Sequence, residues 1–151
     1  MASEPSQRIA LVTGAGQGEA LTRAFSLSSP VLAHDGSRWY VQADGYTRPK
    51  LMRQSGAGAA VAVREVEQDT RVVPLAGNSI LLSQLEICRN YNLFYDLHEL
   101  GPDNRSRRLS ECGRYRFAAP LDDGRVAALR VEAGEAEGVV LGRGGALERS
   151  L

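Results

Sequence analysis

Short apolar runs separated by glycine-containing turns make up most of this chain. Runs of this length that contain β-branched or aromatic residues are typical of strands, and close turns between them are typical of hairpins. The pattern is clearest near the C-terminus. It predicts strands over residues 116–121, 125–131, 139–141 and 146–151, with turns over 122–124, 132–138 and 142–145.

The same alternation of strand and turn extends back through the rest of the chain. Strands are expected over residues 80–87, 93–100 and 107–110 in the middle, over 38–41, 48–54 and 60–66 before that, and over 8–13 and 20–25 at the start. Helical periodicity is hard to find. In the best candidate, residues 57–66, the apolar residues fit the alternating pattern of a strand as well as they fit a helix. This segment also contains β-branched residues, so it too is interpreted as a strand.

Three segments repeat one order of features: an apolar stretch ending in proline, a turn containing glycine, and a β-rich run. Pro30, Pro74 and Pro120 mark them at intervals of about 45 residues, which matches the ~40–50 residues of a four-stranded propeller blade. The sequence therefore predicts an all-β fold of β-propeller blades, each with four antiparallel strands, in an incomplete ring. The expected units are a disordered leader (1–7), a half blade (8–25) and blades at about 26–69, 70–112 and 113–151, together one repeat domain (8–151).

The repeat resembles that of the TolB-like propellers, in which an Arg-Arg-Leu-Thr segment precedes an apolar strand, a Ser-Pro-Asp-Gly turn and a second strand. The matching segments are Arg107-Arg-Leu-Ser110 with the residues up to Leu129, then Ala33-His-Asp-Gly-Ser-Arg-Trp39, and Leu21-Thr-Arg23. Ala76-Gly-Asn78 departs from the pattern because it lacks the aspartate. The resemblance implies binding of proteins, peptides or glycans through channel faces and loops, and a periplasmic or extracytoplasmic parent; the sequence itself leaves the compartment unknown.

Charge and hydropathy exclude some partners. Eighteen Lys and Arg residues balance eighteen Asp and Glu residues, so no global field attracts nucleic acid or an anionic membrane. Membrane insertion is not expected either, because no stretch approaches the ~20 apolar residues of a spanning helix. Residues 1–7 lack the charged start and apolar run of a signal peptide.

One alternative function is a nucleotide-binding fragment resembling the short-chain dehydrogenases. Residues 8–18 resemble the first strand and glycine loop of that family, with Gly14, Gly16 and Gly18 in the loop, and Tyr46 and Lys50 have the spacing of its catalytic pair. However, Pro49 interrupts the helix that this pair requires, and the pair follows the loop too soon to leave room for the βαβ units between them. We therefore expect neither an NAD(P) cofactor nor catalysis.

Other residues with chemical potential lack partners in sequence. His34 and His98 are far apart, so no metal site is expected. Glu86, Asp96 and Glu99 are expected to face solvent, because strand alternation usually places carboxylates there. Cys88 and Cys112 lack the spacing of a zinc or redox motif and are expected to be buried free thiols, although a bridge stays open.

One cluster is the best candidate for a binding surface. Residues 90–95 bring together Asn90, Tyr91, Asn92, Phe94 and Tyr95 at a connection between strands. Rigid aromatic side chains suit recognition because ordering them costs little entropy. The alternative is that the aromatic side chains fill space between blades. The sequence predicts a non-catalytic interaction module that also forms a homodimer, because an open ring would expose apolar segments such as 8–12 and 139–141.

Overall fold

The computed structural model describes the backbone of residues 9–11 and 19–22 and the whole of residues 26–151. These residues form strands with two short 3₁₀ segments, which confirms the all-β prediction. Three antiparallel sheets have four strands each, and a two-stranded sheet precedes them. The first blade consists of β3 (Ser26–Leu32), β4 (Arg38–Ala43), β5 (Lys50–Gln54) and β6 (Val61–Glu65).

The other sheets repeat this simple up-and-down order. The two-stranded sheet consists of β1 (Ile9–Leu11) and β2 (Glu19–Thr22). The second blade consists of β7 (Arg71–Pro74), β8 (Ile80–Ile87), β9 (Leu93–Leu100) and β10 (Ser106–Arg108). The third consists of β11 (Tyr115–Pro120), β12 (Val126–Glu132), β13 (Glu135–Leu141) and β14 (Leu147–Ser150).

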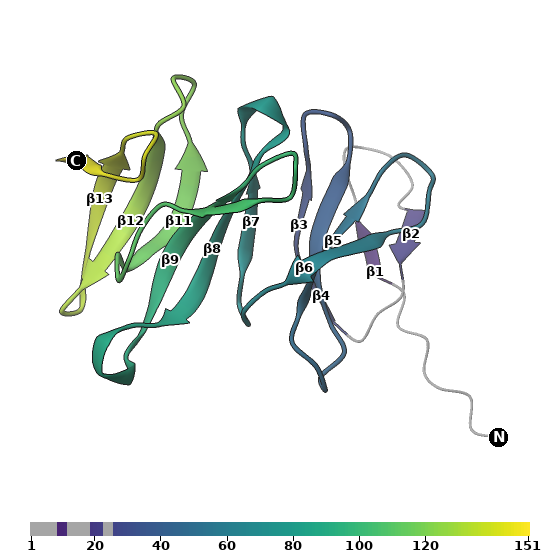
Figure 1. The fold of residues 1–151 in the computed structure, drawn as a ribbon, viewed down its shortest axis with the longest axis horizontal. Coiled ribbons are helices and arrows are strands. Elements are labelled where there is room, and N and C mark those ends of the chain that lie inside the picture. Colours follow the sequence, from purple (N-terminus) through teal and green to yellow (C-terminus); the bar gives the residue numbers. More distant parts are fainter. Residues whose placement is uncertain (1–8, 12–18, 23–25) are drawn as a thin grey trace.

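The blades follow one another in a row, with the third blade at one end and β1–β2 at the other (Figure 1). Strand β7, the first of the second blade, lies between β3 and β11, the first strands of its neighbours. Leu82 packs with Trp39 and Leu51 of the first blade, whereas Leu81 packs with Val139 of the third. The second blade is therefore covered on both faces.

The turn after each first strand explains the repeated Asp-Gly. Asp35 and Asp123 each accept a hydrogen bond from the backbone N–H two residues on, at 2.9 and 3.1 Å. The glycines that follow, Gly36 and Gly124, have φ values of 77° and 80°. The second blade closes the same turn without an aspartate, and Asn78 takes the left-handed conformation at φ 62° in place of glycine.

The proline repeat gave a suitable unit length, but its register was wrong in the first unit. Pro74 and Pro120 end their strands and pair with Ile80 and Val126, the first residues of the next strands. In the first blade Leu32 has that place, two residues after Pro30. Pro30 therefore lies inside the bulge of β3, between Ser28 and Val31, rather than at the end of the strand.

The predicted turn over residues 132–138 was also wrong. Strand β13 already begins at Glu135, and the turn is limited to Ala133 and Gly134, whose φ values are 50° and 86°. Glu137, inside the predicted turn, lies on β13 and pairs with Arg130 on the adjacent strand at 2.6 Å. This ion pair accounts for a charged residue within the sheet.

The expected exposure of residues 139–141 was wrong as well. Val139 and Leu141 are completely buried, because they face Leu81 and Leu97 of the second blade. The side chains of 8–12 lie outside the described residues, as do the glycine loop 14–18 and the leader 1–7. Tyr46 lies in a loop and Lys50 begins β5, so no helix carries the pair of the dehydrogenase alternative.

The turn glycines lead to a test. An added Cβ at Gly36 meets no atom within 4 Å, but its φ is 77°. Gly36→Ala should therefore lower the free energy of unfolding by about 1–2 kcal/mol through backbone strain alone. Gly144→Ala is the matched control, because its Cβ also meets nothing and its φ is not positive. Urea unfolding should separate the two variants; equal stabilities would contradict the strain argument.

Candidate binding surface

The predicted aromatic cluster lies at the end of the β8–β9 hairpin. The two strands pair along their whole length, from Ile80 with Leu100 to Ile87 with Leu93. The Cys88 N–H closes the connection by donating to the Asn92 carbonyl oxygen at 2.7 Å. Asn90 and Tyr91 both have a φ of 59° there. Such a φ is common for asparagine but unusual for a bulky residue such as Tyr91.

Three large apolar side chains are exposed at this hairpin end. Ile87 is 69% exposed, Tyr91 90% and Leu93 56%, and Ile87 and Leu93 are cross-strand partners. We call these three residues the hairpin patch. Exposed apolar clusters rimmed by polar groups mark interaction surfaces more often than scattered single residues do. The sequence prediction missed Ile87 and Leu93, because each has the pattern of an ordinary strand residue.

Phe94 and Tyr95, the other two aromatic residues of the cluster, have different surroundings. Phe94 is half-buried, with the guanidinium carbon of Arg114 4.2 Å from its ring centroid, and Arg114 also pairs with Glu132 at 3.1 Å. Tyr95 is buried, and its hydroxyl donates a hydrogen bond to the Asp69 carboxylate. Burial and this hydrogen bond raise the pKa of Tyr95. Tyr95 therefore fills space in the fold, while Phe94 faces both the fold and the surface.

Two adjoining hollows lie beside the hairpin patch. One, of about 350 Å³, extends from Leu93 and Tyr95 across to Val131 of the third blade. The other, of about 320 Å³, includes Asn90 and Asn92 in its lining. Both are lined by Phe94 and Arg114, so this stack forms the wall between them. The sequence did not identify Arg114 as part of this surface, because it lies in the linker before β11 and not in the aromatic segment 90–95.

Asp96 fixes the segment that carries Arg114. It is 1% exposed, which corrects the expected solvent-facing carboxylate. It accepts hydrogen bonds from the Ser110 hydroxyl at 2.7 Å and from the backbone N–H groups of Cys112 and Gly113 at 2.8 Å each. The Arg108 guanidinium adds a fourth at 3.0 Å. Four donors satisfy the buried charge and hold the linker after β10 against β9.

A disulfide strengthens the same attachment. Cys88 and Cys112 are bonded to each other, with their Cα atoms 5.6 Å apart, so the expectation of free thiols was wrong. The bond joins the hairpin end to the linker rather than matching places on neighbouring blades. A closed loop of 24 residues stabilises a fold by about 3.5 kcal/mol in the chain-entropy model.

The other carboxylates of the expected acidic group are also paired. Glu86 bonds to Arg108 at 2.8 Å and lies 2.7 Å from His98 Nε2, while Glu99 bonds to Arg107 at 2.6 Å. Arginines on β10 therefore neutralise carboxylates on both β8 and β9. Within the described residues no group of three His, Cys, Asp or Glu side chains could hold a metal ion. No helix among those residues has the length and apolar character to span a membrane.

Comparison with solved structures relates this arrangement to one fold. The crystal structure of TolB from Acinetobacter baumannii superimposes with a TM-score of 0.65 over 83% of this chain and 32% of the TolB chain. The fold is that of a TolB-type β-propeller. The sequences are 12% identical, and the chain spans about a third of the length of TolB. No family model and no curated protein matches the sequence.

The buried carboxylate yields a prediction for this TolB-type blade. Asp96→Asn should lower the free energy of unfolding by about 3–5 kcal/mol, since it removes the charge and turns an N–H₂ group toward donors. Asp103→Asn is the control. Its side chain is 57% exposed, and an asparagine oxygen can still accept from the Arg105 N–H. That variant should change stability by less than ~1 kcal/mol in the same urea titration. Equal losses would show that Asp96 does not anchor the linker.

Proposed function

We propose that this chain is a non-catalytic binding module that presents the hairpin patch to a protein or peptide. The observation that carries the proposal is the simultaneous exposure of Ile87, Tyr91 and Leu93 on a hairpin end that is otherwise firmly held. Binding energy at protein surfaces concentrates in a few rigid aromatic and arginine side chains surrounded by a polar rim. Tyr91 and Arg114 are residues of these types.

Pre-organisation favours this surface over other loops of the chain. The disulfide and the Asp96 hydrogen bonds fix the two segments that border the hollows, so little entropy remains to be lost on binding. Arg89 and Glu111 line the second hollow and provide charge of both signs at the rim. A peptide could place an apolar side chain against the hairpin patch and polar groups on Asn90 and Asn92.

Self-association is the second part of the proposal. A propeller usually closes with four to eight blades, and closure covers the blade faces at its ends. Val126 and Ala128 face the second blade, so by strand alternation Leu129 lies on the opposite face, where it is 38% exposed. No blade among the described residues follows the third. Two copies related by a two-fold axis would supply about seven blades, within that range.

Selection of peptides tests the hairpin patch. Peptides selected from a random phage-displayed library on the immobilised chain should bind it, and Tyr91→Ala should weaken that binding at least about tenfold, a typical hot-spot loss. Tyr46→Ala is the matched control, because Tyr46 is 91% exposed on a first-blade loop. Selected peptides that bind the Tyr91 variant as tightly as the unmodified chain would contradict the proposed surface.

Light scattering tests self-association. The 151-residue chain should elute with twice its mass of 16.3 kDa, and Leu129→Glu should return it to the monomer mass. Leu147→Glu is the control: Leu147 is 45% exposed but pairs with Leu141, on the face directed at the second blade. A monomer that persists at high concentration would rule out the homodimer, while leaving the peptide surface to its own test.

A further inference from the structure

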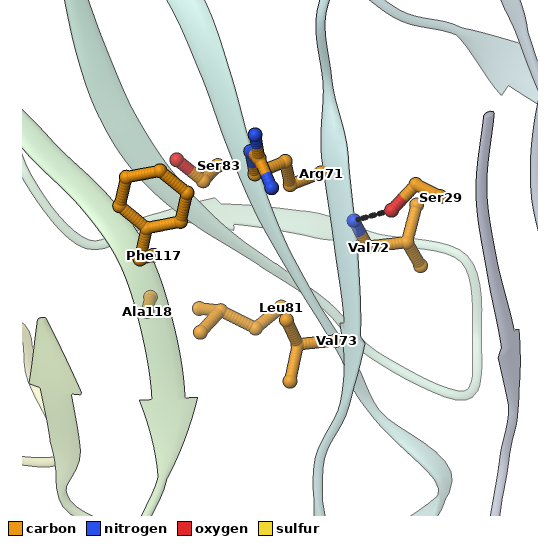
Figure 2. A pocket seen from close by; sticks show the side chains of 8 residues that line it. All are labelled: Ser29, Arg71, Val72, Val73, Leu81, Ser83, Phe117 and Ala118. Atoms are coloured by element: carbon orange, nitrogen blue, oxygen red, sulfur yellow. Dashed lines mark hydrogen bonds between the residues drawn. The ribbon is translucent and has the colours of Figure 1, made fainter.

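A separate hollow of about 280 Å³ lies where the first strands of all three blades meet. It shares no lining residue with the hollows beside the hairpin patch. Figure 2 shows Arg71 and Phe117 on neighbouring strands, with Ser83 between them in this view and Ser29 on the adjacent strand beyond. Leu81 and Ala118, both buried, form its apolar floor.

Two β-bulges border this hollow. The pairing register shifts between Ser28 and Val31 in β3 and between Arg116 and Ala119 in β11. The residues inside the shifts, Ser29 and Phe117, have φ values of 51° and 50°. A phenylalanine in this region is unusual, and bulges often redirect a side chain near a functional site. Here the bulge leaves Phe117 54% exposed beside Arg71.

Arg71 lies over this ring, with its guanidinium carbon 4.5 Å from the centroid. A guanidinium that stacks on an aromatic ring can still donate hydrogen bonds through the N–H groups at its edge. No carboxylate oxygen of the described residues lies within 4.0 Å of Arg71. The cation is therefore held in place without an anion from the described part of the chain.

Three other arginines of the described residues also stack on aromatic rings. Arg53 lies over Trp39 and bonds to Asp35 at 2.9 Å. Arg114 lies over Phe94 and bonds to Glu132 at 3.1 Å. Arg116 lies over Tyr95, whose hydroxyl is bound to the Asp69 carboxylate. Two of these arginines, Arg53 and Arg114, are therefore paired with a carboxylate of the chain, whereas Arg71, like Arg116, has no carboxylate oxygen of the described residues within 4.0 Å.

Ser29 provides a second donor in the lining of the same hollow. The Ser29 oxygen accepts a hydrogen bond from the Val72 N–H at 2.6 Å, which leaves the hydroxyl hydrogen for another acceptor. Ser83 is already engaged, since it donates to the Tyr115 carbonyl oxygen at 3.1 Å. Arg71 and Ser29 are thus the donors available to a ligand, above an apolar floor.

We propose that this hollow binds a carboxylate with an aliphatic group beside it. The guanidinium edge of Arg71 and the Ser29 hydroxyl donate to the carboxylate, and the aliphatic group lies on Phe117, Leu81 and Ala118. Such a ligand is either a peptide C-terminus with an aliphatic last residue or an acidic side chain next to an aliphatic one. The site is distinct from the hairpin patch and from the outer face of the third blade, so it stands or fails independently of both.

The experiment uses N-acetyl-leucine and N-acetyl-leucinamide, which differ only in the carboxylate. Titration into the ¹⁵N-labelled chain at pH 7 should shift the backbone amides of Val72, Val73 and Ala118 in a saturable way with the acid. The amide should bind at least tenfold more weakly. N-acetyl-Glu-Leu-amide, compared with its Gln counterpart, shows whether an internal carboxylate serves as well as a terminal one.

Variants complete the test. Arg71→Gln and Phe117→Leu should each weaken N-acetyl-leucine binding at least tenfold, and the spectrum itself reports that the variants are folded. Arg105→Gln removes one positive charge from an exposed loop and should leave binding unchanged. Equal binding of the acid and the amide, or undiminished binding by Arg71→Gln, would overturn the proposal. Inorganic phosphate that binds as tightly as N-acetyl-leucine would overturn its aliphatic part.

Discussion

The sheet of the second blade has two apolar faces, and each face requires a neighbouring blade to cover it. Leu81 and Leu82 are consecutive residues and both are completely buried, although strand geometry directs them to opposite sides. One packs into the core shared with the third blade and the other into the core shared with the first. Full burial of a leucine side chain stabilises a fold by about 1.5–3 kcal/mol. Loss of either neighbouring blade would expose several such side chains and remove that stabilisation for each of them.

This constraint explains which parts of the fold could be predicted. Strands β8 and β9 begin and end where the sequence pattern placed them, because each begins and ends with an apolar residue and turn segments bound them. The same pattern does not say what covers a face. Residues 139–141 were expected to be exposed because the third blade was treated as the open end of the ring. Val139 and Leu141 instead lie on the face of this blade that packs against the second blade.

The surroundings of Asp96 were hidden from sequence reasoning for a related reason. Alternation along β9 suggests that a carboxylate there meets solvent, but the donors that bury it come from residues 110–113, beyond another strand. Cys112 reaches Cys88 through this same linker. The aromatic residues of the hairpin end were visible in one short segment. Arg114 and Arg71 were not, because each stacks on an aromatic residue that lies on another strand.

The two joints between complete blades differ in how they are fastened. The linker before β7 is attached through Val66, which donates to the Pro49 carbonyl oxygen, and through Asp69. The linker before β11 is bound to β9 by its backbone, held by a buried charge and bonded covalently to the hairpin. The linker that leads into the third blade is therefore fixed to the second blade at several points, and the core shared by the two blades packs them together. In a closed ring, a joint of this kind contributes a fixed angle between its two blades. The other joints must then provide the rest of the curvature that closure requires.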